Sequence, residues 1–166
     1  MSINPDISQD TNYFDVPLLD CNDEIEPLTC SASSEFGSSW GITHPCKNAI
    51  DKTSTEDWAT QNEGASAWIQ INMDKVYKVK RIQIKHRKND NWFERFKVIL
   101  LEFSDGTNIE HELGNHLNVN EISLDKETDF VKITAVSSFE TDVNRKGNHG
   151  FNNIKIFGCI PGIQCV

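Results

Sequence analysis

The sequence predicts an all-β fold, a sandwich or barrel of short strands. Several short segments alternate apolar and polar residues with the period of two that is typical of half-buried strands. Turn-forming residues separate these segments, and no segment longer than one turn carries the apolar stripe of a helix. The chain has 166 residues, of which 37% are hydrophobic, and this is enough for one domain with one core.

Residues 1–29 are predicted to form an extended acidic arm ahead of that domain. They contain seven acidic residues and no Lys or Arg, and Pro5, Pro17 and Pro27 interrupt them. Most of the formal net charge of −9 therefore belongs to the arm, while acids and bases nearly balance in residues 30–166. A chain without an excess of basic residues is not expected to bind nucleic acid.

The clearest strand covers residues 69–73, where the sequence IQINM alternates apolar and polar side chains. Residues 51–57 form an unbroken polar run, which indicates a loop. Trp58 and Trp68 lie between this loop and the strand. Large aromatic side chains that flank a polar loop usually anchor it to the core, so both are predicted to be buried.

Six further segments are predicted to be strands. In Val79–Arg87, alternate residues share one face, so His86 is expected to point inward with Ile82 and Ile84. Phe96–Phe103 is apolar on both faces, which is typical of a central strand, and a tight hairpin turn follows it. The other four segments are Asn108–Leu113, Val119–Leu124, Phe130–Val136 and Phe151–Phe157.

Several motifs together resemble those of a known family. AIDK at 49–52, TEDW at 55–58 and WIQINM at 68–73 come first, followed by FSDGT at 103–107 and GFNNIKIFGC at 150–159. This order is similar to that of discoidin-like domains, also called coagulation factor V/VIII type C domains, and of family 32 carbohydrate-binding modules. The resemblance implies a galactose-binding-like jelly roll of antiparallel strands over residues 30–159, with a tail at 160–166.

A catalytic function is not expected. The sequence HELGNH at 111–116 is similar to the zinc-binding HExxH motif, but its His residues are five positions apart instead of four. On a helix they would diverge by about 140°. The sequence contains no GxSxG elbow, P-loop or GxGxxG. Discoidin-like domains are binding modules, so the resemblance also implies that the chain is not an enzyme.

The resemblance further implies that three loops, 36–47, 87–95 and 137–149, converge at one end and bind the ligand. A sugar site combines an aromatic side chain, which stacks on the C–H face of a pyranose, with Arg, His and Asn side chains that bind hydroxyls. We therefore expect a lectin-like domain that recognises a cell-surface glycan. The Arg-Gly-Asp of fucose-binding lectins is absent, so fucose specificity does not carry over. The candidate ligand-binding residues are Trp40, His44, Arg87, Asn91, Trp92, Arg95, Arg145 and His149.

Two other binding functions stay open at this point. In blood-clotting relatives, aromatic loop tips enter a phospholipid surface, and Trp40 or Trp92 could do the same. Residues 75–97 contain nine bases and two acids, a composition that favours an anionic phospholipid or a glycosaminoglycan. Many of these bases alternate along a predicted strand, however, as they would on a solvated sheet face. A protein-binding adhesion or receptor module is the third alternative.

The resemblance also implies a structural calcium ion in the loop after the AIDK motif. Calcium takes six to eight oxygen ligands. Asp51 corresponds to the Asp of the calcium-binding relatives, and Glu56 offers further oxygens nearby. Lys52 replaces a Gly of the family, and Asn153 stands where the relatives have a Glu. The ammonium group of Lys52 could supply the positive charge in place of the ion.

Five cysteines are present and none forms a CxxC pair, so a zinc ribbon is not expected. The resemblance implies a disulfide between Cys30 and Cys159, and Cys21 and Cys165 lie just outside that pair and could form a second. Cys46 is then left over. The alternative is that all five are reduced and buried. Disulfides are preferred because the bracketing positions suit a link between the chain ends, and they imply an oxidising compartment.

The compartment that these cysteines predict is extracellular, either secreted or on the cell surface. The sequence has no apolar run of the roughly 20 residues that a membrane-spanning helix needs. Its first ten residues are polar, so no secretory leader is visible. We expect that a leader was removed or that the chain is part of a longer protein.

Overall fold

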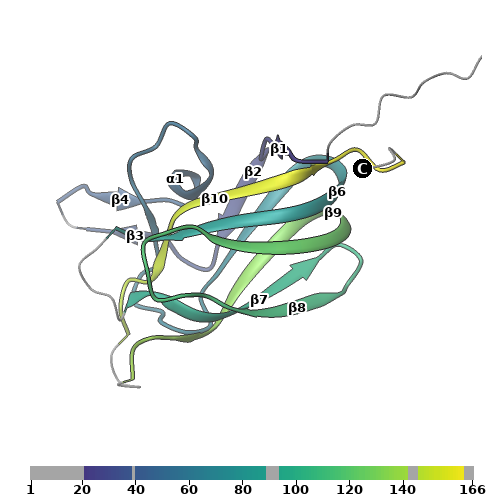
Figure 1. Ribbon diagram of the computed structural model, residues 1–166. Helices are drawn as coiled ribbons and strands as arrows, with labels where there is room; N and C mark the ends of the chain where they lie inside the picture. The colour runs from purple at the N-terminus through teal and green to yellow at the C-terminus, as the bar shows by residue number, and fades with distance from the viewer. Residues whose placement is uncertain (1–20, 39, 89–93, 142–145, 163–166) are drawn as a thin grey trace, which may run out of the picture.

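A computed structural model describes residues 21–38, 40–88, 94–141 and 146–162, and it confirms the all-β prediction (Figure 1). Within these residues the one helix is a single turn. The elements are β1 (Asp23–Ile25), β2 (Thr29–Ala32), β3 (Phe36–Gly37), β4 (Thr43–His44), α1 (Lys47–Ile50), β5 (Trp58–Ala59), β6 (Trp68–His86), β7 (Phe96–Phe103), β8 (Asn108–Glu112), β9 (Asn120–Ser138) and β10 (Gly150–Cys159).

The strands form an antiparallel jelly roll that two long strands, β6 and β9, hold together. The strand order is β1-β10-β6-β9-β7-β8, β2 pairs with β6, and β5 pairs with β10. The first part of β6 pairs with β2, and its second part pairs with β10. A register shift between Asn72 and Tyr77 separates the two parts, so β6 contributes to both layers.

The sequence predicted each long strand as two shorter ones. Of the predicted segments, residues 120–124 and 130–136 belong to the single strand β9, and residues 69–73 and 79–86 belong to β6. The polar segment between the two halves of β9 continues the ladder, with Lys78 opposite Glu127 and Tyr77 opposite Thr128. A polar segment can stay in a ladder where its side chains reach solvent, which the alternation pattern does not reveal.

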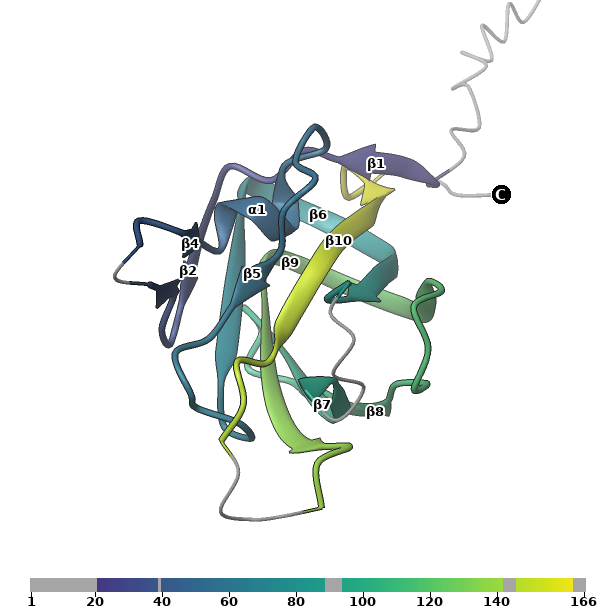
Figure 2. The ribbon, with the colours of Figure 1, turned by 90° about the vertical axis from the view of Figure 1, so that its left-hand side faces the viewer.

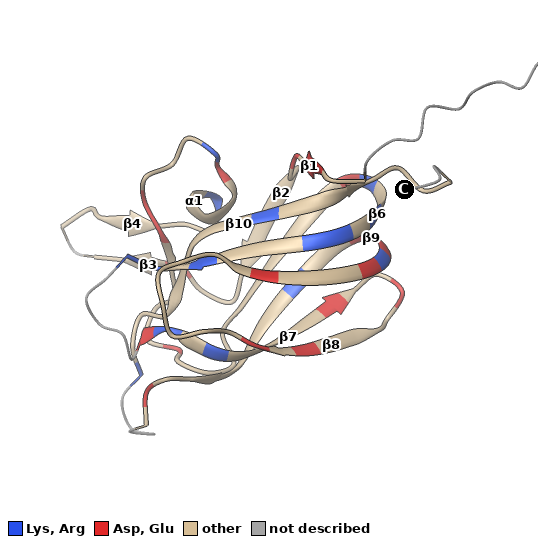
Figure 3. Cartoon of the chain, in the orientation of Figure 1, with Lys and Arg blue, Asp and Glu red and all other residues tan. Residues whose placement is uncertain are grey.

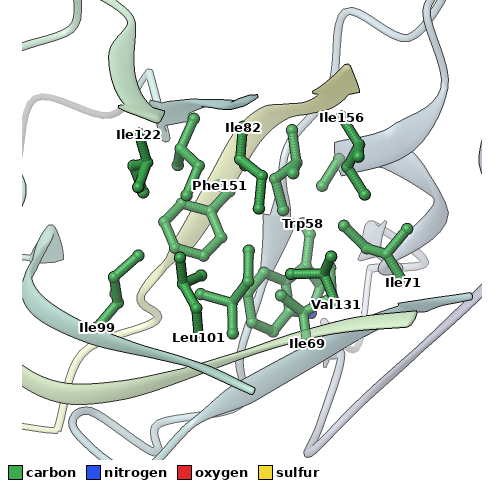
Figure 4. Packing of buried hydrophobic residues seen from close by; sticks show 14 of the residues in the cluster. Trp58, Ile69, Ile71, Ile82, Ile99, Leu101, Ile122, Val131, Phe151 and Ile156 are labelled. Carbon is green, nitrogen blue, oxygen red and sulfur yellow. The ribbon is translucent and has the colours of Figure 1, made fainter. Parts of the chain in front are cut away.

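The core lies between the layers and is built from the alternating inward residues of the strands (Figure 4). Trp58 is fully buried, and its ring lies 5.8 Å from that of Phe151 and 6.5 Å from that of Phe96. Trp68 was predicted to be buried too. It is half-buried on the outer face instead, because Ile69 takes the inward position next to it.

The strand pairing extends ahead of residue 30, where the sequence predicted the boundary between arm and domain. Strand β1 pairs with β10, and Ile25 is buried in the core. The side chain of Lys52 pairs with Glu24 at 3.5 Å and also with Glu26. The folded region therefore includes residues that the sequence placed in the arm, whereas residues 1–20 lie outside the described residues.

The disulfides also differ from those that the resemblance implied. Cys21 is bonded to Cys159, with a Cα–Cα distance of 4.8 Å, and Cys30 is bonded to Cys46, with a Cα–Cα distance of 6.1 Å. Strand β1 places Cys21 beside the end of β10, since Asp23 pairs with Gly158. Cys30 lies in β2, next to the start of α1. Cys165 lies outside the described residues.

Candidate functional site

Four connections lie at one end of the jelly roll, which faces the viewer in Figure 2. They are the β3–β4 hairpin, the β5–β6 connection, the β6–β7 connection and the β9–β10 connection. We call the described residues of 36–44, 57–66, 87–95 and 139–149 the loop end. Figure 2 shows the hairpin and the adjoining ends of β5, β6 and β10 on this side of the molecule.

Asp57 links the elements of the loop end. Its Oδ2 lies 3.4 Å from Nε of Arg87 at the end of β6, and its Oδ1 accepts a hydrogen bond of 2.9 Å from Nδ2 of Asn152 in β10. Its carbonyl oxygen lies 2.9 Å from Nδ1 of His44 in the hairpin and accepts a bond of 3.1 Å from Asn48 in α1. One residue thus holds three strands and the helix in register.

Arg87 is fixed by two neighbours. Besides its contact with Asp57, Arg87 donates a hydrogen bond from Nη1 to the carbonyl oxygen of Asn148. The side chains of Arg87 and Asp57 are each 13% exposed. A guanidinium has five N–H donors, and these two bonds use two of them. The side-chain oxygen of Asn148 accepts a bond of 3.0 Å from the backbone N–H of Asn62, which ties in the β5–β6 connection.

Trp40 lies at the tip of the β3–β4 hairpin and is 89% exposed. The hairpin is closed by a hydrogen bond of 2.8 Å from the backbone N–H of Ser38 to the carbonyl oxygen of Ile42. The Ser38 hydroxyl oxygen accepts hydrogen bonds from the backbone N–H groups of Trp40 and Ile42. Gly41 has a φ of +79°, which glycine adopts without strain. The sequence therefore presents an indole ring to solvent on a tightly bonded tip.

Two predicted ligand-binding residues lie beneath the surface. His149 is fully buried, stacks on Phe96 with ring centres 5.3 Å apart, and has its Nδ1 3.0 Å from the carbonyl oxygen of Gly147. Arg95 is 9% exposed and donates to Oδ1 of Asn115 at 3.1 Å. These contacts position the loops from below. Three further predictions, Asn91, Trp92 and Arg145, lie outside the described residues.

Sequence reasoning missed the β5–β6 connection and the central role of Asp57. Gln61 accepts a bond of 3.2 Å from the backbone N–H of Gly37, so this connection also contacts the hairpin. Asp57 directly precedes the buried Trp58. A polar residue next to a buried aromatic one is only a weak indication of a functional site. Its partners are 30 and 95 positions away in the chain, which local pattern cannot show.

The predicted calcium residues fit an ion poorly. Oδ1 of Asp51 accepts bonds from the N–H of Thr53 at 2.8 Å and from its hydroxyl at 2.7 Å, and these bonds hold the pKa of Asp51 below its usual value. Glu56 is exposed, and Asn153 lies in β10 opposite Lys85. No three His, Cys, Asp or Glu side chains of the described residues gather into a metal site. Calcium at Asp51 stays a prediction.

The basic segment at residues 75–97 is largely neutralised. Six of its nine bases lie between 3.0 and 3.9 Å from a carboxylate. Figure 3 shows basic residues of β6 beside acidic residues of β9. Lys78 and Lys80, for example, share Asp125, and Arg81 pairs with Glu121. The segment is thus a solvated sheet face with balanced charge along much of its length.

A hollow of about 680 Å³ lies elsewhere, between residues 26–30, Pro45–Lys47 and residues 50–53. Its lining includes the Cys30–Cys46 disulfide but no aromatic residue. A sugar ring would find no stacking partner there. The loop end therefore offers the better chemistry for a polar ligand. In the described part of the chain, no helix is long and apolar enough to cross a membrane.

Comparison with known proteins gives a family and a set of similar folds. The family model of the F5/8 type C domain matches residues 29–155 of this chain. No curated protein sequence matches the chain. The family 32 carbohydrate-binding module of NanJ from Clostridium perfringens, solved with galactose, is 21% identical, with a TM-score of 0.63 over 78% of this chain and 92% of that module.

Two other solved structures are similar at lower identity. A fucose-binding module from Streptococcus pneumoniae is 13% identical, with a TM-score of 0.62 over 82% of this chain and 96% of that one. Chitosan-binding module 1 of a chitosanase/glucanase from Paenibacillus sp. IK-5 is 15% identical, with a TM-score of 0.61 over 81% and 96%. At these identities the likeness shows a shared fold.

Proposed function

Because the chain belongs to the F5/8 type C domain family, we propose that it is a non-catalytic domain that recognises a glycan through the loop end. The observation that carries this proposal is the pairing of an exposed Trp40 with the network around Asp57. His44 connects the two, since it lies in the Trp40 hairpin and contacts the Asp57 carbonyl oxygen. A pyranose site needs an aromatic surface and fixed hydrogen-bond donors, and the loop end supplies both.

In this proposal each of these residues has a role. Trp40 stacks on the C–H face of a sugar ring, and the remaining N–H donors of Arg87 bind hydroxyl oxygens. His44 uses Nδ1 for Asp57, which leaves Nε2 for the ligand. Asn91, Trp92 and Arg145 are proposed from the sequence to complete the site. The similar modules support this reading, since their described ligands include galactose and fucose.

Binding to an anionic phospholipid is the second candidate. It is favoured by the hairpin tip, where Ile42 is 56% exposed beside the 89% exposed Trp40. Two apolar residues on a protruding tip could enter a lipid surface. The basic residues of β6 are paired with acidic ones and leave little unbalanced positive charge. This disfavours binding to an anionic phospholipid and to a glycosaminoglycan. A protein-binding adhesion module is the third candidate. We propose an extracellular location, which the two disulfides support.

A glycan-array screen of the purified chain, with and without calcium, tests the proposal. Anionic liposomes are the parallel arm. We expect binding to a defined group of glycans, and Trp40→Ala and Arg87→Ala should each weaken it at least about tenfold, as loss of a central contact does. Leu28→Ala is the matched control, since Leu28 is 64% exposed but lies at the hollow instead of the loop end.

Signal on liposomes alone would replace the glycan function with lipid binding, and silence on both would leave a protein partner. Calcium dependence that is lost in Asp51→Asn would establish Asp51 as a calcium ligand. Glycan binding that survives both loop-end substitutions would show that the site lies elsewhere.

A further inference from the structure

The centre of the loop end is an ion pair with no net charge. Nε of Arg87 lies 3.4 Å from Oδ2 of Asp57, and both side chains are largely buried. Water and salt screen a largely buried pair less than an exposed one. A ligand group that approaches the free N–H donors of Arg87 therefore also experiences the negative charge of Asp57.

The described residues of the loop end carry no excess of positive charge. They contain four acidic residues, Asp57, Glu63, Glu94 and Glu140, and four basic ones, Arg87, Lys88, Arg95 and Lys146. One of these bases, Arg95, is buried and bonded to Asn115 below the surface. The composition thus contains no excess of cations that would attract a sulfate or carboxylate.

We infer that the site selects neutral glycans over sulfated or sialylated ones, and that Asp57 is the positioning residue that sets this selectivity. The inference rests on the proposed function. Neutral hydroxyl oxygens accept hydrogen bonds from Arg87 without a cost from Asp57. An anionic group at the same donors is repelled by the Asp57 carboxylate, which cannot move away because Asn152 holds its other oxygen at 2.9 Å.

Asp57 also sets the direction of the donors. Nε of Arg87 is bonded to Asp57, and Nη1 is bonded to the Asn148 carbonyl oxygen. These two bonds fix the orientation of the guanidinium plane. In Asp57→Asn the charge is removed while the shape stays. The amide can still accept the Asn152 bond, but it offers Arg87 no carboxylate. The guanidinium then carries an unbalanced positive charge toward the ligand.

The test is a panel of galactose-terminated glycans, each paired with its sialylated or sulfated counterpart. For the unmodified chain we expect neutral members to bind at least about tenfold more tightly than their acidic counterparts. In Asp57→Asn we expect weaker binding of neutral members and an acidic-to-neutral ratio that rises at least about tenfold. The matched control is Asp125→Asn, which makes the same change at a carboxylate on the strand face that pairs with Lys78 and Lys80.

A merely structural role of Asp57 would lower the affinity for both classes together and leave the ratio unchanged, and this result would overturn the inference. Equal or stronger binding of acidic members by the unmodified chain would overturn it too, without need of any variant. Both results would leave glycan recognition intact. If the unmodified chain binds no glycan of the panel or of the array, the proposed function fails and the inference fails with it.

Discussion

His86 shows how a single residue links the candidate site to the stability of the fold. It is the last residue of β6, next to Arg87, and it is 1% exposed. Its Nε2 lies 3.1 Å from the carbonyl oxygen of Gly114, and its ring stacks on Phe151 at 6.3 Å. Burial is the main cause that lowers the pKa of His86 to about 4, and the nearby positive charge of Arg95 adds to it.

This lowered pKa predicts a loss of stability in acid. The unfolded chain takes up a proton near pH 6.5, whereas the folded chain resists it until about pH 4. The stability that depends on neutral His86 is therefore complete above pH 6.5 and is lost as the pH falls toward 4. Between pH 7.5 and pH 4.5, the free energy of unfolding should fall by about 2 to 3 kcal/mol through this group.

Urea unfolding at the two pH values measures this effect, with His86→Gln as the reference because Gln does not titrate. The difference in unfolding free energy between the two proteins should change with pH by the amount given above. A difference that is the same at both pH values would show that His86 does not carry the acid sensitivity.

At the scale of single elements, Gly150 determines how the short strand β5 reaches β10. Gly150 pairs with Ala59, and a Cβ atom at Gly150 would lie 1.9 Å from the Trp58 carbonyl oxygen. A backbone atom at that distance has to shift. Since Asp57 directly precedes β5, the same close approach also places the centre of the loop end.

Gly150→Ala should therefore destabilise the fold by about 1 to 3 kcal/mol, as overpacking does, and should also weaken glycan binding. Gly37→Ala is the control, because a Cβ atom at Gly37 has no neighbour within 4 Å. Urea unfolding, followed by circular dichroism, measures the stability of both variants, and the glycan array measures their binding. Equal stabilities of the two variants would contradict the close approach of β5 to β10.

The elements also show how much of the structure the sequence could predict. Phe96–Phe103 was predicted with the bounds of β7, and Ile82, Ile84 and His86 share the buried face of β6 as expected. These predictions depend on the local alternation of side chains. The joining of segments into β6 and β9 depends on pairing partners far along the chain, and so does the network around Asp57. Local pattern carries no information about either.

At the scale of the whole molecule, the disulfides fix the fold where its sheet pairing is short. Cys21–Cys159 joins residues 138 positions apart and secures the three-residue strand β1 against β10. Cys30–Cys46 joins β2 to the start of α1, and it closes a segment of 16 positions that includes the Trp40 hairpin. The family resemblance implied a different pair, Cys30–Cys159, and the structure pairs Cys21 with Cys159 because β1 lies against β10.

Removal of Cys30–Cys46 by a Cys30→Ser, Cys46→Ser double substitution should lower the free energy of unfolding by about 3 kcal/mol, the entropy of closing a loop of that length. Because the hairpin would lose one anchor, binding that depends on Trp40 should weaken as well. Thermal unfolding and array binding measure these effects. A peptide map under non-reducing conditions that links Cys30 to another cysteine would contradict the pairing.

The most direct test of the central claim locates the bound sugar on the molecule. The measurement is a titration of the ¹⁵N-labelled chain with the glycan that binds best on the array, followed by NMR. We predict the largest shifts at the Trp40 indole N–H, at Nε–H of Arg87 and at the amide of Asp57. Shifts confined to Leu28 and Lys47 at the hollow beside α1, with the loop end unchanged, would contradict the account.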